Sequence, residues 1–345
     1  MYAVRLPDPG RPPLLTEVER PTPREGEVLL RVDAVGLCHS DLHVIDAERG
    51  ASGFRTPFTL GHEVAGQIVG GGPAAAVTIG ERVVVHGPWG CGRCGRCADG
   101  RDNYCDRRSE LSWAGMGLGR DGGMAEYVLV PSARHLVPIG ELDAAEAAPL
   151  TDAGLTSYHA IAGVRARLGE DSAVAVIGIG GLGHLAVQML RALTPSRMLA
   201  VDVREEALAV ADRSGAHLST KATPDAHHVL RAATGGVGVD AVLDFVGSRS
   251  SLDLAARSLR TEGDLVVVGS GSGTLTVSKP GPLPQGARLS LPFWGSRSEL
   301  AEVVALCRSG AVKPEVERFP LAAVHDAIAA LRGGTLAGRA VLIPS

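Results

Sequence analysis

Residues 173–193, AVAVIGIGGLGHLAVQMLRAL, place the tightest constraint on how this chain folds. AVAVIG (173–178) has the unbroken apolar character of a buried parallel strand, and GLGHLAVQMLRAL (181–193) that of an apolar helix. Between them Gly178, Gly180 and Gly183 have G-x-G-x-x-G spacing, with Gly181 and Leu182 in the same turn. In such a turn the glycines permit the sharp bend, the approach of a pyrophosphate and close helix–strand packing. The stretch therefore predicts a dinucleotide site at the start of a helix, where free N–H groups favour phosphate.

The rest of the second half continues this alternation of strands and helices. Further strands are expected at 197–202, 239–247 and 263–269, and helices at 204–215 and 251–260. The segment 274–292 interrupts the pattern with several prolines and glycines, and 287–295 offers one more apolar strand. This order predicts an α/β domain with a doubly wound parallel sheet and helices on both faces.

The nature of the dinucleotide is indicated by Asp202, which ends the second strand nineteen positions after Gly183. A carboxylate there accepts hydrogen bonds from ribose hydroxyls and repels a 2′-phosphate, which favours NAD over NADP. Arg204 is a counter-indication, because a guanidinium could meet that phosphate, although it also suits a solvated helix start. Flavin binding is an alternative, but a flavin motif of this kind is more often found at the start of a chain.

The first half has a different pattern. Short apolar or alternating runs at 27–36, 63–70, 81–87 and 124–130 are separated by glycine and proline, which predicts a compact antiparallel β domain. A chain of 345 residues is long enough for two domains. We expect a first domain over 1–152, the dinucleotide domain over 153–295, and a return of 296–345, which ends in an apolar strand at 338–344, to the first domain.

Four of the six cysteines, Cys91, Cys94, Cys97 and Cys105, lie within fifteen residues. A disulfide knot, a redox pair, an iron–sulfur cluster and a metal site are the alternatives. The chain starts without the apolar segment of a secretory signal, which predicts a reducing, cytoplasmic location where metal binding is favoured over disulfides. Closely spaced glycines would let four thiolates converge on one zinc, a closed site without an open position for chemistry. We therefore expect a structural-zinc lobe at about 90–106.

Composition excludes several classes of partner. The formal net charge is −4 and the lysines and arginines are scattered, so nucleic-acid binding is not expected. The chain contains no apolar stretch of the ~18 residues that a membrane-spanning helix requires, so membrane insertion is not expected either.

A second set of candidate ligands is spread over three motifs, GLCHSDLH (36–43), LGHEVAG (60–66) and APLTDAGLTSYHA (148–160). Each is unremarkable alone: Cys38 suits a core position, His62 a polar pair with Glu63, and Asp152 a helix cap. Together Cys38, His62 and Asp152 supply S, N and O donors for one catalytic zinc with an open fourth position. Ser40 and His43 could carry a proton from that position to water.

In this order the motifs resemble the zinc-dependent medium-chain alcohol dehydrogenases, over about residue 25 to the end. The stretches CHSD, GPWGCG, ARHLVPIG and TDAGLTSYHA are most similar to bacterial NAD-dependent secondary-alcohol dehydrogenases. The resemblance implies a GroES-like β-barrel catalytic domain and a Rossmann domain with a doubly wound parallel sheet, the end of the chain returning to the first.

The resemblance also assigns roles to residues. It implies two zinc ions per chain, one held by Cys38, His62 and Asp152, with Glu63 as an exchange ligand, and one held by the four clustered cysteines. Asp152 stands where many animal and plant relatives have cysteine. Ser40 matches the hydroxyl that bonds the substrate oxygen, and His43 the outer end of the proton relay. It implies cofactor contacts at the glycine turn, Asp202 and Arg204. It further implies that the pyrophosphate contacts His39 and Arg339, and that the nicotinamide half contacts Thr156, Val246 and Val268.

The implied function is reversible hydride transfer between a secondary alcohol or ketone and NAD(H). A primary-alcohol or aldehyde-directed enzyme is one alternative, and a non-catalytic dinucleotide sensor is another. Candidates for the wall of the substrate pocket are Phe54, Trp89 and Trp294, each of which also suits ordinary core packing. A homo-oligomer is expected through the 287–295 edge strand, with a dimer favoured over a tetramer.

Overall fold

The computed structural model describes residues 1–48 and 53–345. The chain folds into two units. One unit, the catalytic unit below, comprises 1–155, 294–310 and 314–345; the other, the dinucleotide unit, comprises 156–293 and 311–313.

The catalytic unit is built on two β-sheets whose strand pairs are mostly antiparallel. The smaller has the order β2 (Leu14–Glu17), β1 (Tyr2–Leu6) and β4 (Phe58–Thr59). The larger follows the order β10 (Leu136–Pro138), β6 (Arg82–Val85), β5 (Glu63–Gly71), β3 (Val28–Leu37), β18 (Arg339–Ile343) and β17 (Val316–Pro320), and β9 (Tyr127–Val130) also pairs with β3. Two-residue strands β7 (Gly115–Met116) and β8 (Gly119–Arg120) pair beside them.

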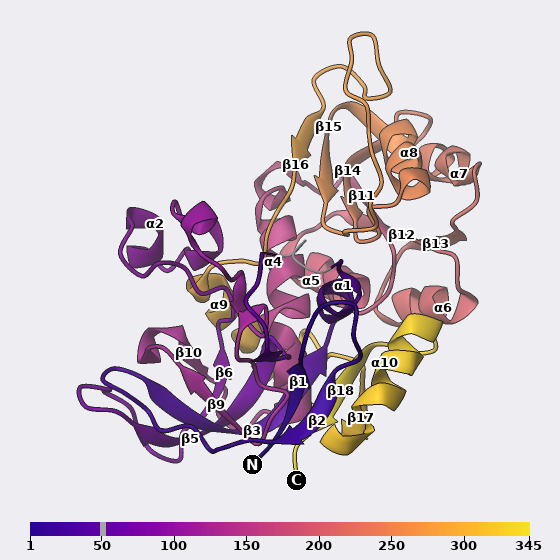
Figure 1. Ribbon diagram of the computed structural model, residues 1–345. Coiled ribbons are helices and arrows are strands. Elements are labelled where there is room, and N and C mark those ends of the chain that lie inside the picture. Colours follow the sequence, from indigo (N-terminus) through magenta and orange to yellow (C-terminus); the bar gives the residue numbers. More distant parts are fainter. Residues whose placement is uncertain (49–52) are drawn as a thin grey trace. The chain divides into compact units, whose positions relative to one another are not determined.

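The end of the chain lies within this sheet. β18 pairs antiparallel with β3, Ala340 opposite Leu37, although 303 positions separate these residues in the sequence (Figure 1). The helices of the unit are α1 (His39–Asp46), α2 (Gly95–Ala98), which lies within the cysteine lobe, α3 (Ala144–Ala147), α9 (Arg297–Arg308) and α10 (Val324–Gly333). A further helix, α4 (Ala153–Ala162), starts here and continues into the other unit.

The dinucleotide unit contains a six-stranded, all-parallel sheet. Its order is β13 (Leu218–Lys221), β12 (Arg197–Asp202), β11 (Ala173–Ile177), β14 (Val239–Asp244), β15 (Leu259–Val267) and β16 (Arg288–Ser290). Four helices cover it, and α5 packs with α6 while α7 packs with α8: α5 (Gly183–Leu193), α6 (Glu205–Arg213), α7 (Ala226–Ala233) and α8 (Arg249–Ser258).

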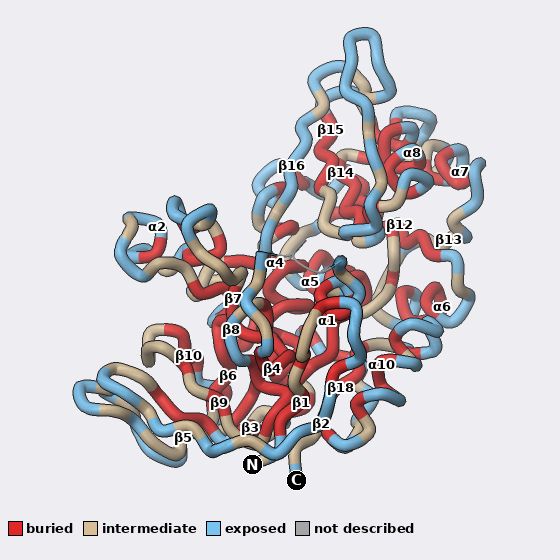
Figure 2. The backbone as a smooth tube through the Cα atoms, in the orientation of Figure 1, coloured by how far each residue is buried: buried red, intermediate tan, exposed pale blue. Residues whose placement is uncertain are grey.

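Burial explains why the central strands of this sheet are apolar along their whole length. Every residue of β11 is buried (Figure 2). Ala173, Ala175 and Ile177 of this strand join one core cluster that also contains Leu199, Val242 and Leu265. The strand order reverses direction between β11 and β14, where a doubly wound sheet binds its ligand. The predicted parallel α/β fold and antiparallel β fold are both confirmed.

One predicted strand is wrong in extent. Of the expected 287–295, only Arg288–Ser290 pairs with β15. Pro292 has no N–H with which to continue the ladder, and Trp294 takes a left-handed backbone with φ 49°. The first two strands, β13, α7, β17 and α10 were not predicted, because their sequences are short or mix polar and apolar residues without a clear period.

Within the described ranges, none of the helices has the length and apolar character that a membrane crossing requires.

Candidate active site and metal centres

The three motifs of the first half converge within the catalytic unit. Cys38 follows β3 and is the N-cap of α1, His62 precedes β5, and Asp152 precedes α4. The pairing of β3 with β5 sets Gly36 opposite Glu63. A Cβ on Gly36 would lie 1.9 Å from Glu63 Oε2, so the glycine provides the space that this carboxylate occupies.

The donor atoms of this cluster fit zinc. Asp152 Oδ2 lies 3.5 Å from Cys38 Sγ and 3.3 Å from His62 Nε2. Ligands of a tetrahedral zinc, at about 2.0–2.3 Å from the metal, lie roughly 3.3–3.8 Å from one another, which these separations match. The donor atoms of Cys38, His62, Glu63 and Asp152 all lie within 4.8 Å of one another. The cluster therefore offers four donors that could hold one zinc, and the predicted role of Glu63 as an exchange ligand stays a prediction.

Asp41, which was not predicted, contacts His62 through the ring nitrogen that does not face Asp152. Its Oδ1 lies 3.3 Å from His62 Nδ1, and its Oδ2 accepts the backbone N–H of Cys38 at 2.9 Å. Burial alone would lower the pKa of His62, but the charge of Asp41 and the hydrogen bond to Asp152 raise it well above its ordinary value. A carboxylate on the outer nitrogen of a histidine orients the ring toward a metal. Its position three residues after Cys38, typical of a capping box, was the available signal.

Glu63 is fully buried and is held by two donors. Its Oε1 accepts a hydrogen bond from Nη2 of Arg339 and, at 3.2 Å, one from the backbone N–H of Ala153. Burial raises the pKa of Glu63, while the guanidinium of Arg339 opposes the rise. Arg339 is itself 3% exposed, so the structure places its guanidinium on Glu63. The predicted contact of Arg339 with a pyrophosphate stays a prediction.

The residues predicted for proton transfer lie on α1. Ser40 Oγ is 3.7 Å from Cys38 Sγ, which puts a hydroxyl at the edge of the donor cluster. His43 is exposed to solvent, as is His39. A relay that begins at Ser40 would therefore end in water at His43.

The four-cysteine lobe fits a second zinc. All six cysteines of the chain lie within the described residues, and none of them forms a disulfide. Cys94 Sγ and Cys105 Sγ are 4.0 Å apart, close to the ~3.8 Å edge of a tetrahedron of sulfurs around zinc. Cys105 Sγ accepts the backbone N–H groups of Cys91 and Arg107 at 3.3 and 3.4 Å. The backbone N–H of Arg93 helps to hold the pKa of Cys91 at about 6, which favours a metal-binding thiolate.

A third group of possible ligands has a structural explanation. His86, Asp102 and His135 are buried close together. Both oxygens of Asp102 accept hydrogen bonds from Arg134, at 2.6 and 2.7 Å, so the carboxylate is already neutralised by a bidentate pair. The imidazole rings lie nearly parallel, at 17°, with centroids 6.1 Å apart. This group fixes the lobe to the sheet.

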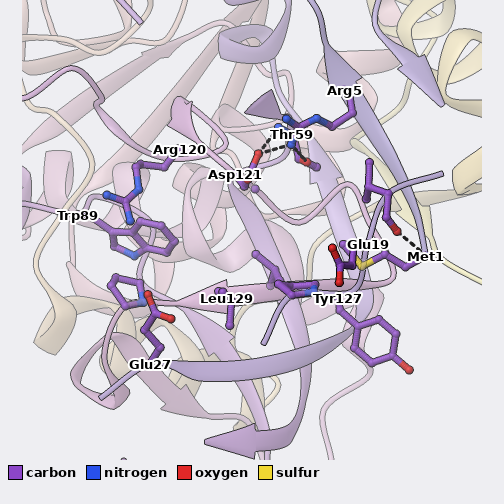
Figure 3. A pocket seen from close by; sticks show the side chains of 15 residues that line it. Met1, Arg5, Glu19, Glu27, Thr59, Trp89, Arg120, Asp121, Tyr127 and Leu129 are labelled. Carbon is purple, nitrogen blue, oxygen red and sulfur yellow. Dashed lines mark hydrogen bonds and ion pairs between the residues drawn. The ribbon is translucent and has the colours of Figure 1, made fainter. Parts of the chain in front are cut away.

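The three predicted pocket residues are placed differently. The Trp294 ring meets His62 edge to face, with centroids 5.8 Å apart. Phe54 instead packs edge to face on Phe58 at 6.3 Å. Trp89 lines a pocket of about 290 Å³ in the catalytic unit, together with Arg120 and the Arg5–Asp121 ion pair (Figure 3). Of the three, the structure brings only Trp294 to the zinc ligands.

The glycine turn has the geometry that a dinucleotide needs. Gly178 has φ 88°, and a Cβ on Gly183 would lie 1.9 Å from the carbonyl oxygen of Gly178. A Cβ on Gly180 would meet nothing within 4 Å, so this glycine faces open space. The first and third glycines thus serve the turn and the packing, and the second leaves the backbone accessible to phosphate.

A pocket of about 350 Å³ adjoins this turn within the dinucleotide unit. Asp202, Val246 and Gly178 line it, with Pro224 and Arg257. Asp202 Oδ2 accepts the N–H of Ile179 at 2.6 Å, and its Oδ1 accepts the N–H of Arg204 at 2.9 Å. The carboxylate is therefore held rigidly at the mouth of the turn.

Val246 and Val268, two residues predicted to contact the nicotinamide, are held in place by Asp244. This buried carboxylate was not itself expected to have a role. Its Oδ1 accepts the N–H of Val246 at 2.9 Å, and its backbone carbonyl accepts that of Val268 at 2.8 Å. One residue at the end of β14 thus holds both loops. Thr156, on α4, is buried; its contact with the cofactor remains a prediction.

Comparison with known proteins agrees with this geometry. Residues 24–141 match the alcohol dehydrogenase GroES-like domain family, and residues 181–309 match the zinc-binding dehydrogenase family. The chain is 35% identical to an NAD-dependent alcohol dehydrogenase of Sulfurisphaera tokodaii, with 100% of each chain covered. The alcohol dehydrogenase of Aeropyrum pernix superposes with a TM-score of 0.92 at 34% identity, again over 100% of each chain.

A third relative is the acetophenone reductase of Geotrichum candidum, solved in complex with NAD. It has a TM-score of 0.84 at 31% identity, covering 99% of this chain and 96% of that one. The chain belongs to the zinc-containing medium-chain alcohol dehydrogenase family. It is accordingly an oxidoreductase acting on CH–OH groups.

Proposed function

We propose that this enzyme oxidises secondary alcohols to ketones, reversibly, with NAD as the hydride acceptor. The observation that carries the proposal is the cluster of Cys38, His62 and Asp152. The distances from Asp152 Oδ2 to Cys38 Sγ and His62 Nε2 match the edges of a zinc tetrahedron, and three such ligands would leave one position of a bound zinc for the substrate. Support for the secondary-alcohol preference comes from the likeness to an acetophenone reductase, whose named ketone is reduced to a secondary alcohol.

The chain's own residues would bind, orient and deprotonate the substrate. When bound, zinc would lower the pKa of the alcohol, and NAD would accept the hydride from its carbinol carbon. Cys38, His62 and Asp152 would hold the metal, with Glu63 poised to exchange. The Ser40 hydroxyl would accept the alcohol proton while passing its own proton on toward His43, which would release a proton to solvent. The Trp294 indole would form one wall beside the reacting carbon.

The test of the proposal is the initial rate of NADH formation from 2-propanol and from its primary isomer 1-propanol, each with NAD and with NADP. We expect the secondary alcohol with NAD to give the highest kcat/KM, by roughly tenfold or more, since one well-placed methyl contact contributes about 1–3 kcal/mol. A primary-alcohol enzyme would reverse the order of the two isomers. No turnover of either by protein carrying two zincs would leave the sensor alternative.

A second prediction concerns the choice of dinucleotide. Asp202→Asn removes the charge that would repel a 2′-phosphate and keeps the shape of the side chain. We expect the ratio of kcat/KM for NADP to that for NAD to rise about tenfold, because hydrogen bonds to charged groups contribute roughly 1.5–3 kcal/mol. The control is Asp212→Asn, a carboxylate on α6 that accepts a hydrogen bond from Ser219. An unchanged ratio in Asp202→Asn would assign the selectivity to another residue.

We also propose that the enzyme is a homo-oligomer, with a dimer favoured, formed by pairing of β16 with its copy. β16 is the edge strand of the six-stranded sheet, and Leu289 and Leu291 near it are 45% and 70% exposed. An unpaired edge with apolar side chains is suited to strand pairing with a second copy.

A further inference from the structure

The segment Trp294–Arg297 carries the tryptophan that meets His62, and its backbone is unusual. Trp294 has φ 49°, a left-handed conformation that a bulky side chain rarely adopts. Its indole is nevertheless 4% exposed and sits edge to face against the His62 ring. A conformation of this kind persists only where neighbouring groups hold it in place.

His86 supplies such a hold directly beside the strained residue. Its Nε2 lies 2.9 Å from the carbonyl oxygen of Gly295. A carbonyl oxygen only accepts, so Nε2 must carry the proton and donate it. Burial lowers the pKa of His86 to about 4, which keeps the ring neutral near pH 7. The backbone N–H of His86 is bonded in turn to the carbonyl of His135 at 2.7 Å, so the donor is itself fixed.

The residue after His86 completes the seat for the indole. A Cβ on Gly87 would lie 3.3 Å from Cζ2 of Trp294 and 3.1 Å from the carbonyl oxygen of His62. Both distances are shorter than ordinary van der Waals contact, so the bare backbone at Gly87 allows the ring to lie against the zinc ligand. Of these two adjacent residues, His86 binds the carbonyl of the segment and Gly87 leaves room for the indole ring.

The far end of the segment is anchored as well. The backbone N–H of Arg297 donates to the carbonyl of Gly100 at 3.0 Å, within the cysteine lobe. Its Nη2 donates to the carbonyl of Leu136 at 3.0 Å. Ser296 caps α9 by accepting the N–H of Glu299. With Arg297 fixed in this way, the peptide between Gly295 and Ser296 is held on two sides. The Ser296 N–H donates to Glu299 Oε2 at 2.7 Å, and the Gly295 carbonyl accepts from His86.

We propose that His86 is a positioning residue: by bonding the Gly295 carbonyl it fixes the Trp294 indole against His62 and so limits the size of alcohol that the site accepts. This inference rests on the proposed function. The substrate site would be occupied by a secondary alcohol whose larger substituent lies against the indole of Trp294. Without the His86 bond the indole is less restrained. The kcat/KM for alcohols with larger substituents is then expected to increase most.

The first experiment compares His86→Leu and His86→Gln with the wild type. Gln can donate an N–H to Gly295, whereas Leu cannot. The readout is the ratio of kcat/KM for 1-phenylethanol to that for 2-propanol, measured in protein with two zincs per chain. We expect the ratio to rise about tenfold in His86→Leu and to stay within twofold in His86→Gln. His135→Leu, which removes the buried ring stacked beside His86, is the matched control and should leave the ratio unchanged.

The second experiment does not depend on activity. Of the three tryptophans, Trp294 becomes the sole reporter in the background Trp89→Phe with Trp113→Phe. We expect weak acrylamide quenching of its fluorescence, several-fold stronger quenching after His86→Leu, and little change after His86→Gln. If this background does not fold, the kcat/KM ratio decides alone.

The inference is overturned if His86→Leu leaves the ratio within twofold or lowers it, or if His86→Gln shifts it as far as His86→Leu. A folded reporter whose quenching His86→Leu does not change also overturns it. Failure of the proposed function would have a different result, because the wild type would then turn over neither alcohol. In that case the quenching measurements alone would test whether His86 positions Trp294.

Discussion

Cys38→Ala is expected to lower kcat at least about 1000-fold and to reduce the zinc content from two per chain to one. Cys38 provides the only sulfur of the catalytic cluster, and its Sγ lies 3.5 Å from Asp152 Oδ2. A Lewis-acid metal contributes several kcal/mol to the stabilisation of developing charge, which corresponds to roughly three or more orders of magnitude in rate. Because alanine is tolerated at a buried position of this size, the fold should persist.

The measurement pairs metal analysis with initial rates and a thermal melt. The matched control is Cys307→Ala, which removes a buried cysteine on α9 outside both clusters. This control should keep two zincs and turn over like the wild type. If Cys38→Ala retained both zincs and more than a tenth of the activity, the catalytic metal would have to be held by other residues.

Cys97→Ser is expected to produce the opposite pattern: a lowered Tm with turnover largely retained below the melting transition. Cys97 is 2% exposed, and the lobe from Cys91 to Cys105 is fifteen residues long. Because the unfolded chain does not keep a preformed metal site, the free energy of zinc binding contributes directly to folding, and loss of one thiolate ligand removes much of it. We expect Tm to fall by roughly 5–10 °C.

Zinc analysis should find one zinc per chain in Cys97→Ser, as in Cys38→Ala, so the two variants separate the two metals. The catalytic variant loses activity and keeps its melting temperature, whereas the lobe variant does the reverse. A Tm within 2 °C of the wild type in Cys97→Ser would show that the lobe is held by its protein contacts, such as the Arg134–Asp102 pair, without the metal.

The features that could be predicted from the sequence are those with a local physical signature. The glycine turn was predicted because each glycine has a separate steric role. The structure shows the positive φ at Gly178, the close packing at Gly183 and the open space at Gly180. The parallel sheet followed from unbroken apolar strands, since both faces of β11 are buried. The cysteine lobe followed from the close spacing of its four thiols together with the expected reducing location.

Features set by long-range contacts could not be read in the same way. Asp41 behind His62, and Asp244 beneath two loops, look in sequence like ordinary carboxylates near helix or strand ends. The left-handed turn at Trp294 was mistaken for strand, because apolar character hides a backbone conformation that a histidine more than 200 positions away helps to hold. Only the folded chain brings such residues together.

The most direct test of the central claim is to follow the hydride itself. With 2-propanol deuterated at C2 as substrate, the mass of the reduced NAD formed by zinc-loaded enzyme shows whether the carbinol hydrogen was transferred. We predict reduced cofactor one mass unit heavier than that from unlabelled alcohol. Unlabelled reduced cofactor, or none from protein carrying two zincs, would contradict the proposal that this enzyme oxidises secondary alcohols with NAD.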